Sequence, residues 1–243
     1  FQHENIETYI FQYSHVSYML HYSTMYKFTN TIQLLKLCKR HKLPISEITI
    51  RYEMERSKLS HQEIWTKMKK VRDVMVDAIQ NAIHKPNVSA YKMGGGNAPL
   101  IYKAIKKKMI LNSLSIKAMA YATATGERNS AMGRIVAFPT AGGSGVLPGC
   151  VISLGEEWKL TEETIIRGLF NAAGIGIIIA EGATFSAAAG GCQAEVGAAT
   201  GMTASAVTEM RGGTAQQCAN AAALALKNKL GLACDPLGGL VAV

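Results

Sequence analysis

Apolar side chains recur at intervals of three and four along much of this chain, which is the spacing of a helix with one buried face. The clearest run begins at Ser60, where Ser60 and Glu63 form a capping box in which each side chain accepts a hydrogen bond from the other's backbone amide. Apolar residues then follow from Ile64 to Ala82, and Pro86 ends the run. The pattern predicts one long amphipathic helix.

Further helices are predicted on both sides of this run. A short one begins at Thr29, presents Ile32 and Leu35 on its apolar face, and is broken by Pro44. The other predicted helices lie over residues 113–125, over a buried segment at 165–180 that Thr161 caps, and over a segment that Thr214 and Gln217 open and Gly231 ends. The second half shows neither the alternation of strands nor a repeating strand–helix–strand pattern. The predicted fold class is all-α, a compact helical domain with glycine-rich loops.

Length and composition narrow the class of protein further. A chain of 243 residues with 48% apolar residues can bury a core as one domain or as a domain with an appendage. The most apolar run, 169–180, is shorter than the roughly 20 residues that a membrane-spanning helix needs. No secretory signal pattern opens the chain. We therefore expect a cytoplasmic protein without a membrane partner.

The net charge of +9 comes largely from lysines in the first half of the chain. Nucleic-acid binding is one interpretation of such lysine runs, and a solvated helix face or a surface for an acidic partner chain is the other. No aromatic-interleaved or zinc-finger pattern accompanies the lysines. We therefore favour the second interpretation and expect no nucleic acid.

Five cysteines without regular spacing argue against a secreted disulfide scaffold. Cys192 stands out because glycines and the polar pair Gln193 and Glu195 surround it in GGCQAEVG, so the bare backbone lets a ligand approach. Cys234 follows 42 positions later in LACDPLGG, too far for a self-contained zinc loop. From spacing alone, a metal site assembled by the fold and two ordinary thiols both remain open. The other three cysteines, Cys38, Cys150 and Cys218, are interpreted as structural.

Two glycine-rich loops carry candidate binding chemistry. In PTAGGSG, residues 139–145, the hydroxyls and bare amides of Thr140, Gly142, Gly143 and Ser144 suit an amino-acid carboxylate and hydroxyl. This loop is neither a P-loop, because no lysine follows the last glycine, nor a nucleophile elbow, because Val146 replaces the second glycine. In SAYKMGGGNAP, residues 89–99, the loop amides could meet an anionic group such as a carboxylate, or the segment could be a plain connector.

Three blocks in order resemble a known family. They are GRIVAFPTAGGSGVLPG at 133–149, EGATFSAAAGGCQAEVGAATGM at 181–202 and LKNKLGLACDPLGGLVAV at 226–243. Together they look like the α chain, or α domain, of the iron–sulfur-dependent L-serine dehydratases (L-serine ammonia-lyases). The likeness also covers AMGR at 131–134 and, more loosely, the chain from about Met25 onward.

The resemblance implies a function and a cofactor. The implied reaction converts L-serine to pyruvate and ammonia by elimination of water, assisted by a 4Fe–4S cluster that three cysteines hold. Cys192 and Cys234 match two ligand positions, and the third is expected in a Val-Pro-Cys ending just beyond Val243. Thr140, Gly142, Gly143 and Ser144 match the substrate loop. No residue is assigned as the general base.

The resemblance also implies partners and boundaries. A β subunit, on a partner chain or fused, is expected, and so is an oligomer. Residues 1–24 match nothing in the family and are interpreted as an extension, with the catalytic domain at 25–243. Two alternatives stay open: a related cluster-dependent lyase such as a cysteine desulfidase, and a non-catalytic helical binding subunit.

Overall fold

The computed structural model describes residues 25–89, 92 and 94–231, together with the backbone of short strands at 6–7, 236–237 and 240–241. Within these ranges the helices are α1 (Thr31–His41), α2 (Ile45–Ser57), α3 (His61–His84), α4 (Asn97–Lys106), α5 (Leu114–Ser130), α6 (Val146–Glu157), α7 (Glu162–Gly182), α8 (Ala187–Met210) and α9 (Ala215–Lys229). The strands, two residues each, are β1 (Ile6–Glu7), β2 (Ile135–Val136), β3 (Pro236–Leu237) and β4 (Leu240–Val241). The all-α prediction is confirmed.

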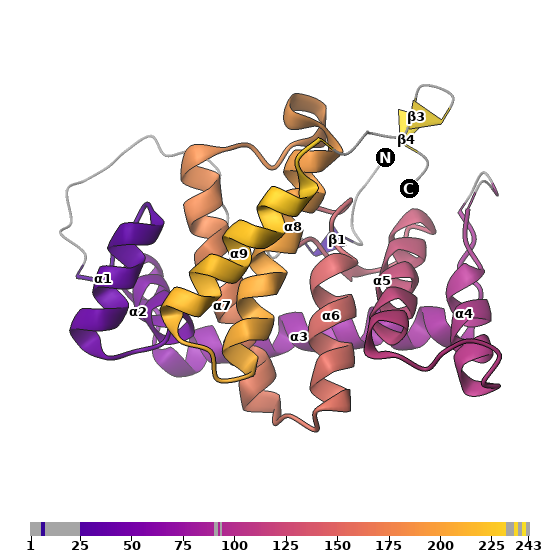
Figure 1. Ribbon diagram of the computed structural model, residues 1–243, viewed down its shortest axis with the longest axis horizontal. Coiled ribbons are helices and arrows are strands. Elements are labelled where there is room, and N and C mark those ends of the chain that lie inside the picture. The colour runs from indigo at the N-terminus through magenta and orange to yellow at the C-terminus, as the bar shows by residue number, and fades with distance from the viewer. Residues whose placement is uncertain are drawn as a thin grey trace.

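The long helix predicted from Ser60 is α3, and its capping box is present. Every apolar residue of the predicted stripe is buried along it, from Ile64 to Ala82. Figure 1 shows α3 running lengthwise through the molecule, with α5, α6 and α7 across it. It therefore forms the base on which the later helices pack.

The prediction for the first helix was partly wrong. Helix α1 spans the expected residues, but its buried side chains are Leu34, Leu37 and Cys38, while Ile32 is exposed. Pro44 does not lead into a loop, because it is the N-cap of α2, a helix that the pattern did not predict. Helix α2 buries polar residues as well as isoleucines, so its sequence carries no clear apolar stripe.

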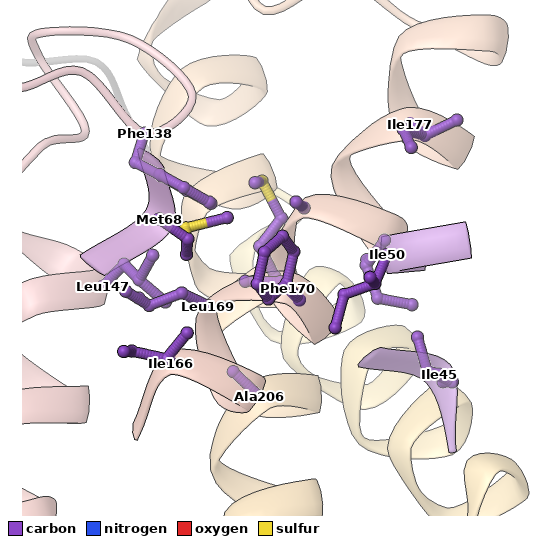
Figure 2. Packing of buried hydrophobic residues seen from close by; sticks show 14 of the residues in the cluster. Ile45, Ile50, Met68, Phe138, Leu147, Ile166, Leu169, Phe170, Ile177 and Ala206 are labelled. Atoms are coloured by element: carbon purple, nitrogen blue, oxygen red, sulfur yellow. The ribbon is translucent and has the colours of Figure 1, made fainter. Parts of the chain in front are cut away.

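The core is centred on α7, as its apolar sequence predicted. Figure 2 shows Phe170 and Leu169 of α7 among side chains from α2, α3, α6 and α8. By length and composition α7 could cross a membrane, but 61% of its most apolar window is buried inside the protein. Such burial is typical of a core helix, which passes the same test.

Helix α8 has a break near its start that matters for the site. Gly191 has φ 74° and ψ 172°, which lies outside helical geometry, so a short first turn is followed by a long straight section from Cys192. The long section packs between α7 and α9 and also contacts α6. Small residues permit this packing: a Cβ on Gly201 would lie 2.9 Å from the Leu226 side chain of α9.

Candidate functional site

The loop at residues 139–145 connects β2 to the N-terminus of α6. Two backbone hydrogen bonds shape it, from the Ser144 amide to the Ala141 carbonyl at 3.2 Å and from the Val146 amide to the Gly143 carbonyl at 3.1 Å. The Asn129 side chain of α5 donates to the same Ala141 carbonyl at 3.2 Å. Among the described residues, the Gly142 and Gly143 amides donate no hydrogen bond to a protein acceptor. They remain open to an anionic ligand beside a helix N-terminus, where the dipole favours negative charge.

The loop at residues 139–145 has exposed and buried residues side by side. Gly142 is exposed and Thr140 is half-buried, whereas Gly143 and Ser144 are buried. The Ser144 hydroxyl has no hydrogen-bond partner in the described structure. A buried polar atom without a partner carries a free-energy cost that a bound ligand or water can remove.

Cys192 starts the long section of α8, directly after the break at Gly191. The Cys192 side chain is half-buried and not disulfide-bonded. A Cβ built on Gly191 would meet no atom within 4 Å, so the space beside the backbone here is open. A thiol at a helix N-terminus, next to open space, suits a metal ligand or a nucleophile.

Glu195 is the site residue that sequence reasoning did not assign. It lies one turn after Cys192 on α8, and its carboxylate accepts a hydrogen bond from the Thr140 hydroxyl. A Cβ on Gly142 would lie 2.5 Å from Glu195 Oε2, so only glycine allows the loop to approach the carboxylate this closely. The signal that could have found it is its spacing of three from Cys192, which places both on one helix face.

The loop is therefore seated on the helix that carries Cys192. A Cβ on Gly143 would lie 3.2 Å from the Ala199 Cβ, one turn beyond Glu195. The structure thus brings Thr140, Gly142 and Gly143 against α8, although they are more than 40 residues away in sequence. That these residues and Ser144 bind substrate stays a prediction.

The remaining described cysteines, Cys38, Cys150 and Cys218, have raised pKa values. Burial, and then the charge of Glu209, raise the pKa of Cys38 to about 12. The same two causes raise the pKa of Cys218 to about 12, and burial raises that of Cys150. That these three cysteines are structural stays a prediction. Cys234 lies outside the described residues, and within them no three Cys, His, Asp or Glu side chains form a metal-binding group.

Amides at the end of the second glycine-rich loop, residues 89–99, bind a carboxylate, as the sequence suggested. This carboxylate is a side chain of the protein itself. Glu127 of α5 accepts hydrogen bonds from the amides of Asn97 at 2.6 Å and Ala98 at 3.2 Å. It thereby caps the N-terminus of α4, where Gly96 offers no side chain for this purpose. Gly95, at φ 117°, allows the loop to approach Asn87 and Val88. The described part of this loop therefore has a structural explanation.

A helical domain whose glycine-rich polar loop rests on a cysteine-bearing helix has the parts of a catalytic chain that binds a small polar ligand. Residues 40–243 match the family described as serine dehydratase alpha chain. The chain belongs to that family, and the resemblance read from its three blocks is confirmed.

Individual relatives agree with the family match. The chain is 42% identical over 217 residues to the probable L-serine dehydratase, alpha chain, of Bacillus subtilis strain 168, covering 89% of this chain and 72% of that one. It is 39% identical over 210 residues to the L-serine dehydratase, alpha chain, of Peptoniphilus asaccharolyticus, covering 86% and 72%. It is 32% identical over 231 residues to L-serine dehydratase TdcG of Escherichia coli K12, covering 91% of this chain but 50% of that one.

Proposed function

We propose that this chain deaminates L-serine to pyruvate and ammonia by β-elimination of water. Family membership supports the reaction class, since the relatives are named L-serine dehydratases. The observation that supports the location of the active site is the Thr140–Glu195 hydrogen bond, which joins the glycine-rich loop to the helix that contains Cys192. Neither a desulfidase nor a non-catalytic subunit is favoured by the names of these relatives.

The reaction sets three tasks for the site. The zwitterion must be held, the Cα proton must go to a base, and the Cβ–O bond must break with its electron pair leaving on oxygen, which takes up a proton and departs as water. The enamine so formed tautomerises and is hydrolysed to pyruvate and ammonia. In this proposal the Gly142 and Gly143 amides hold the substrate carboxylate, and the Thr140 and Ser144 hydroxyls hydrogen-bond the substrate.

A 4Fe–4S cluster is the cofactor that we propose, in keeping with the family. Cys192 and Cys234 are the proposed ligands within this sequence, with a third cysteine expected after Val243. The position of Cys192 supports the proposal, because this half-buried residue directly follows Gly191, where a Cβ would meet no atom within 4 Å. When bound, the cluster would supply a Lewis-acidic iron for the leaving oxygen. The protein's own part is to orient serine so that this oxygen is presented correctly.

The proposed biological unit contains a second, β-type chain, as the designation alpha chain implies. The relatives of about twice the matched length, such as TdcG, leave room for such a part in one polypeptide. The exposed apolar side chains Met109 and Leu111, in the loop between α4 and α5, support a surface that another chain covers. We further propose that residues 25–243 form the catalytic domain, that the assembly is oligomeric, and that it acts in the cytoplasm.

The test is amino-acid turnover by the chain extended through the expected Val-Pro-Cys end, prepared without oxygen and with its β-type partner. Pyruvate release is measured for L-serine and L-cysteine, beside iron and sulfide content. L-Serine should be turned over in preference to L-cysteine. A loaded complex that releases pyruvate from neither would refute the lyase assignment, and a preference for L-cysteine would favour the desulfidase.

The cluster proposal makes its own prediction. Cys192→Ser should lose the brown colour, most of the bound iron and the activity together, because serine is a poor ligand for iron in such clusters. Cys150→Ser is the matched control, since Cys150 is a free and half-buried cysteine like Cys192 but matches no ligand position of the family, and it should keep both iron and activity. Equal iron contents in the two variants would remove Cys192 from the ligand set.

A further inference from the structure

Glu195 presents a carboxylate to the candidate site. This carboxylate accepts a hydrogen bond from the Thr140 hydroxyl, and among the described residues no ion pair joins it to a lysine, arginine or histidine. The side chain is half-buried, so it is accessible from the surface beside exposed Gly142. A partly desolvated carboxylate held by one hydroxyl is a natural partner for a cationic group of a ligand.

The position of this carboxylate matches the geometry of an amino acid. Its carboxylate carbon and both oxygens lie within 2.7 Å of where a Cβ on Gly142 would be, so the carboxylate lies against a loop residue whose amide donates no hydrogen bond to a described residue. The ammonium and carboxylate of an α-amino acid are attached to the same carbon, so the protein groups that bind them must be neighbours. Open amides for the anion and an acidic side chain for the cation stand side by side here.

We propose that Glu195 binds the α-ammonium group of the substrate and so restricts this site to amino acids. The inference rests on the proposed function, since it assigns a residue to the same site. Thr140 acts as a positioning residue, because its hydroxyl donates a hydrogen bond to Oε1 of the carboxylate that lies against Gly142. A hydroxy acid of the same length without the ammonium group would bind the amides but gain nothing from Glu195.

The test compares two ligands that differ only in this group. Binding of L-serine and of 3-hydroxypropanoate is measured by calorimetry on the cluster-loaded complex, in the wild type, in Glu195→Gln and in Glu157→Gln. Glu195→Gln removes the charge but keeps an oxygen for the Thr140 hydroxyl, so the fold should persist, and thermal melting checks this. Glu157→Gln is the control, because it removes the same charge at the end of α6 that is opposite to the loop.

Glu195→Gln should weaken L-serine binding by about 10- to 100-fold, the range for losing a hydrogen bond between charged groups. Binding of 3-hydroxypropanoate should change less than about threefold, and Glu157→Gln should leave both ligands unaffected. Equal weakening of both ligands, or unchanged serine affinity with a lost turnover rate, would overturn the inference, and the second result would instead place Glu195 in the chemical step.

The two proposals fail in different ways. A wild-type complex that binds L-serine yet releases no pyruvate contradicts the proposed function, while the ligand comparison still decides the role of Glu195. A wild-type complex that releases pyruvate, with Glu195→Gln showing unchanged discrimination between the ligands, contradicts the role of Glu195 alone.

Discussion

At Thr140 a single hydroxyl joins two parts of the site that are 55 residues apart in sequence. It donates to Glu195 on α8, so it orients both the loop and the carboxylate. Thr140→Val keeps the shape of the side chain and removes this hydrogen bond. A serine turnover loss of about 1 to 3 kcal/mol in kcat/KM is expected, or roughly 5- to 150-fold.

Steady-state kinetics with L-serine check this, and Thr66→Val on the exposed face of α3 is the control. The Thr66 hydroxyl is exposed and donates a hydrogen bond to the Gln62 carbonyl of its own helix, at 2.7 Å. Kinetics equal to the wild type in Thr140→Val, with the fold intact by circular dichroism, would remove Thr140 from the site.

Glu209 is a half-buried carboxyl whose ionisation opposes folding, because desolvation penalises its charged form. Desolvation by burial raises its pKa, outweighing the lowering by the hydrogen bonds from Ser46 and Asn171. Its Oε2 accepts from the Ser46 amide at 3.3 Å and from the Asn171 side chain at 2.6 Å. Because the folded-state pKa lies above the unfolded one, this group favours folding below its ordinary pKa, and that contribution is lost as pH rises through the folded value.

Glu209→Gln, neutral at every pH, should therefore raise the melting temperature near pH 7.5, and the gain should shrink towards pH 4. The glutamine oxygen can accept the same two hydrogen bonds, and its amide can donate to the buried, unpartnered Ser46 hydroxyl or Asn171 oxygen. Thermal melts at several pH values measure the gain, with exposed Glu157→Gln as control. A gain that does not depend on pH would contradict this account.

At the scale of the element, some helix N-termini are capped by residues nearby in sequence and others by residues far away in sequence. The caps of α3 and α9 lie within four residues, so Ser60 with Glu63 and Thr214 with Gln217 were predictable from sequence. The cap of α4 comes from Glu127, 30 residues away, and only the fold supplies it. The site follows the same division: the loop and Cys192 were recognisable as motifs, whereas the Thr140–Glu195 contact depends on how α6 and α8 pack.

Helix α2 shows why the pattern of apolar residues does not predict every helix. Ser46, Thr49 and Glu53 are buried among its isoleucines, since neighbours cover it on more than one side. The Thr49 hydroxyl bonds the Ile45 carbonyl at 2.9 Å, and Glu53 pairs with Arg56 at 2.9 Å. Polar residues inside the core interrupt the apolar stripe on which sequence prediction depends.

The cap of α4 gives a prediction about stability. Glu127→Ala would leave the Asn97 and Ala98 amides without their acceptor, and Ala98 is fully buried. The free energy of unfolding should fall by about 1 to 3 kcal/mol, the cost of unsatisfied buried donors. Urea unfolding measures the loss, and hydrogen exchange should show faster exchange in α4 than in α3. Loss of stability without faster exchange in α4 would contradict the capping role.

At the scale of the whole molecule, the surface around the α4–α5 loop stands out because it exposes large apolar side chains. Leu111 is 78% exposed and Met109 72%, beside a hollow of about 820 Å³ that Tyr102, Lys117 and Tyr121 line. Lys106, Lys107 and Lys108 precede the apolar pair. Glu156 and Glu157 line the same hollow, so the border of the apolar side chains carries both signs of charge. Such a surface suits a partner that presents apolar groups among charged residues.

If the β-type chain covers this surface, Leu111→Ser should weaken the complex without unfolding the α chain. Burial of a leucine contributes about 1.5 to 3 kcal/mol, so the dissociation constant should rise by about 10- to 100-fold.

Leu224→Ser is the matched control, because Leu224 is similarly exposed, at 69%, on α9. Both chains are co-expressed, and complex formation is measured by size-exclusion chromatography and analytical ultracentrifugation. Serine turnover should fall in Leu111→Ser in proportion to the complex lost, while the iron content per α chain stays constant. Equal dissociation constants for the two variants would mean that the partner binds elsewhere on the α chain.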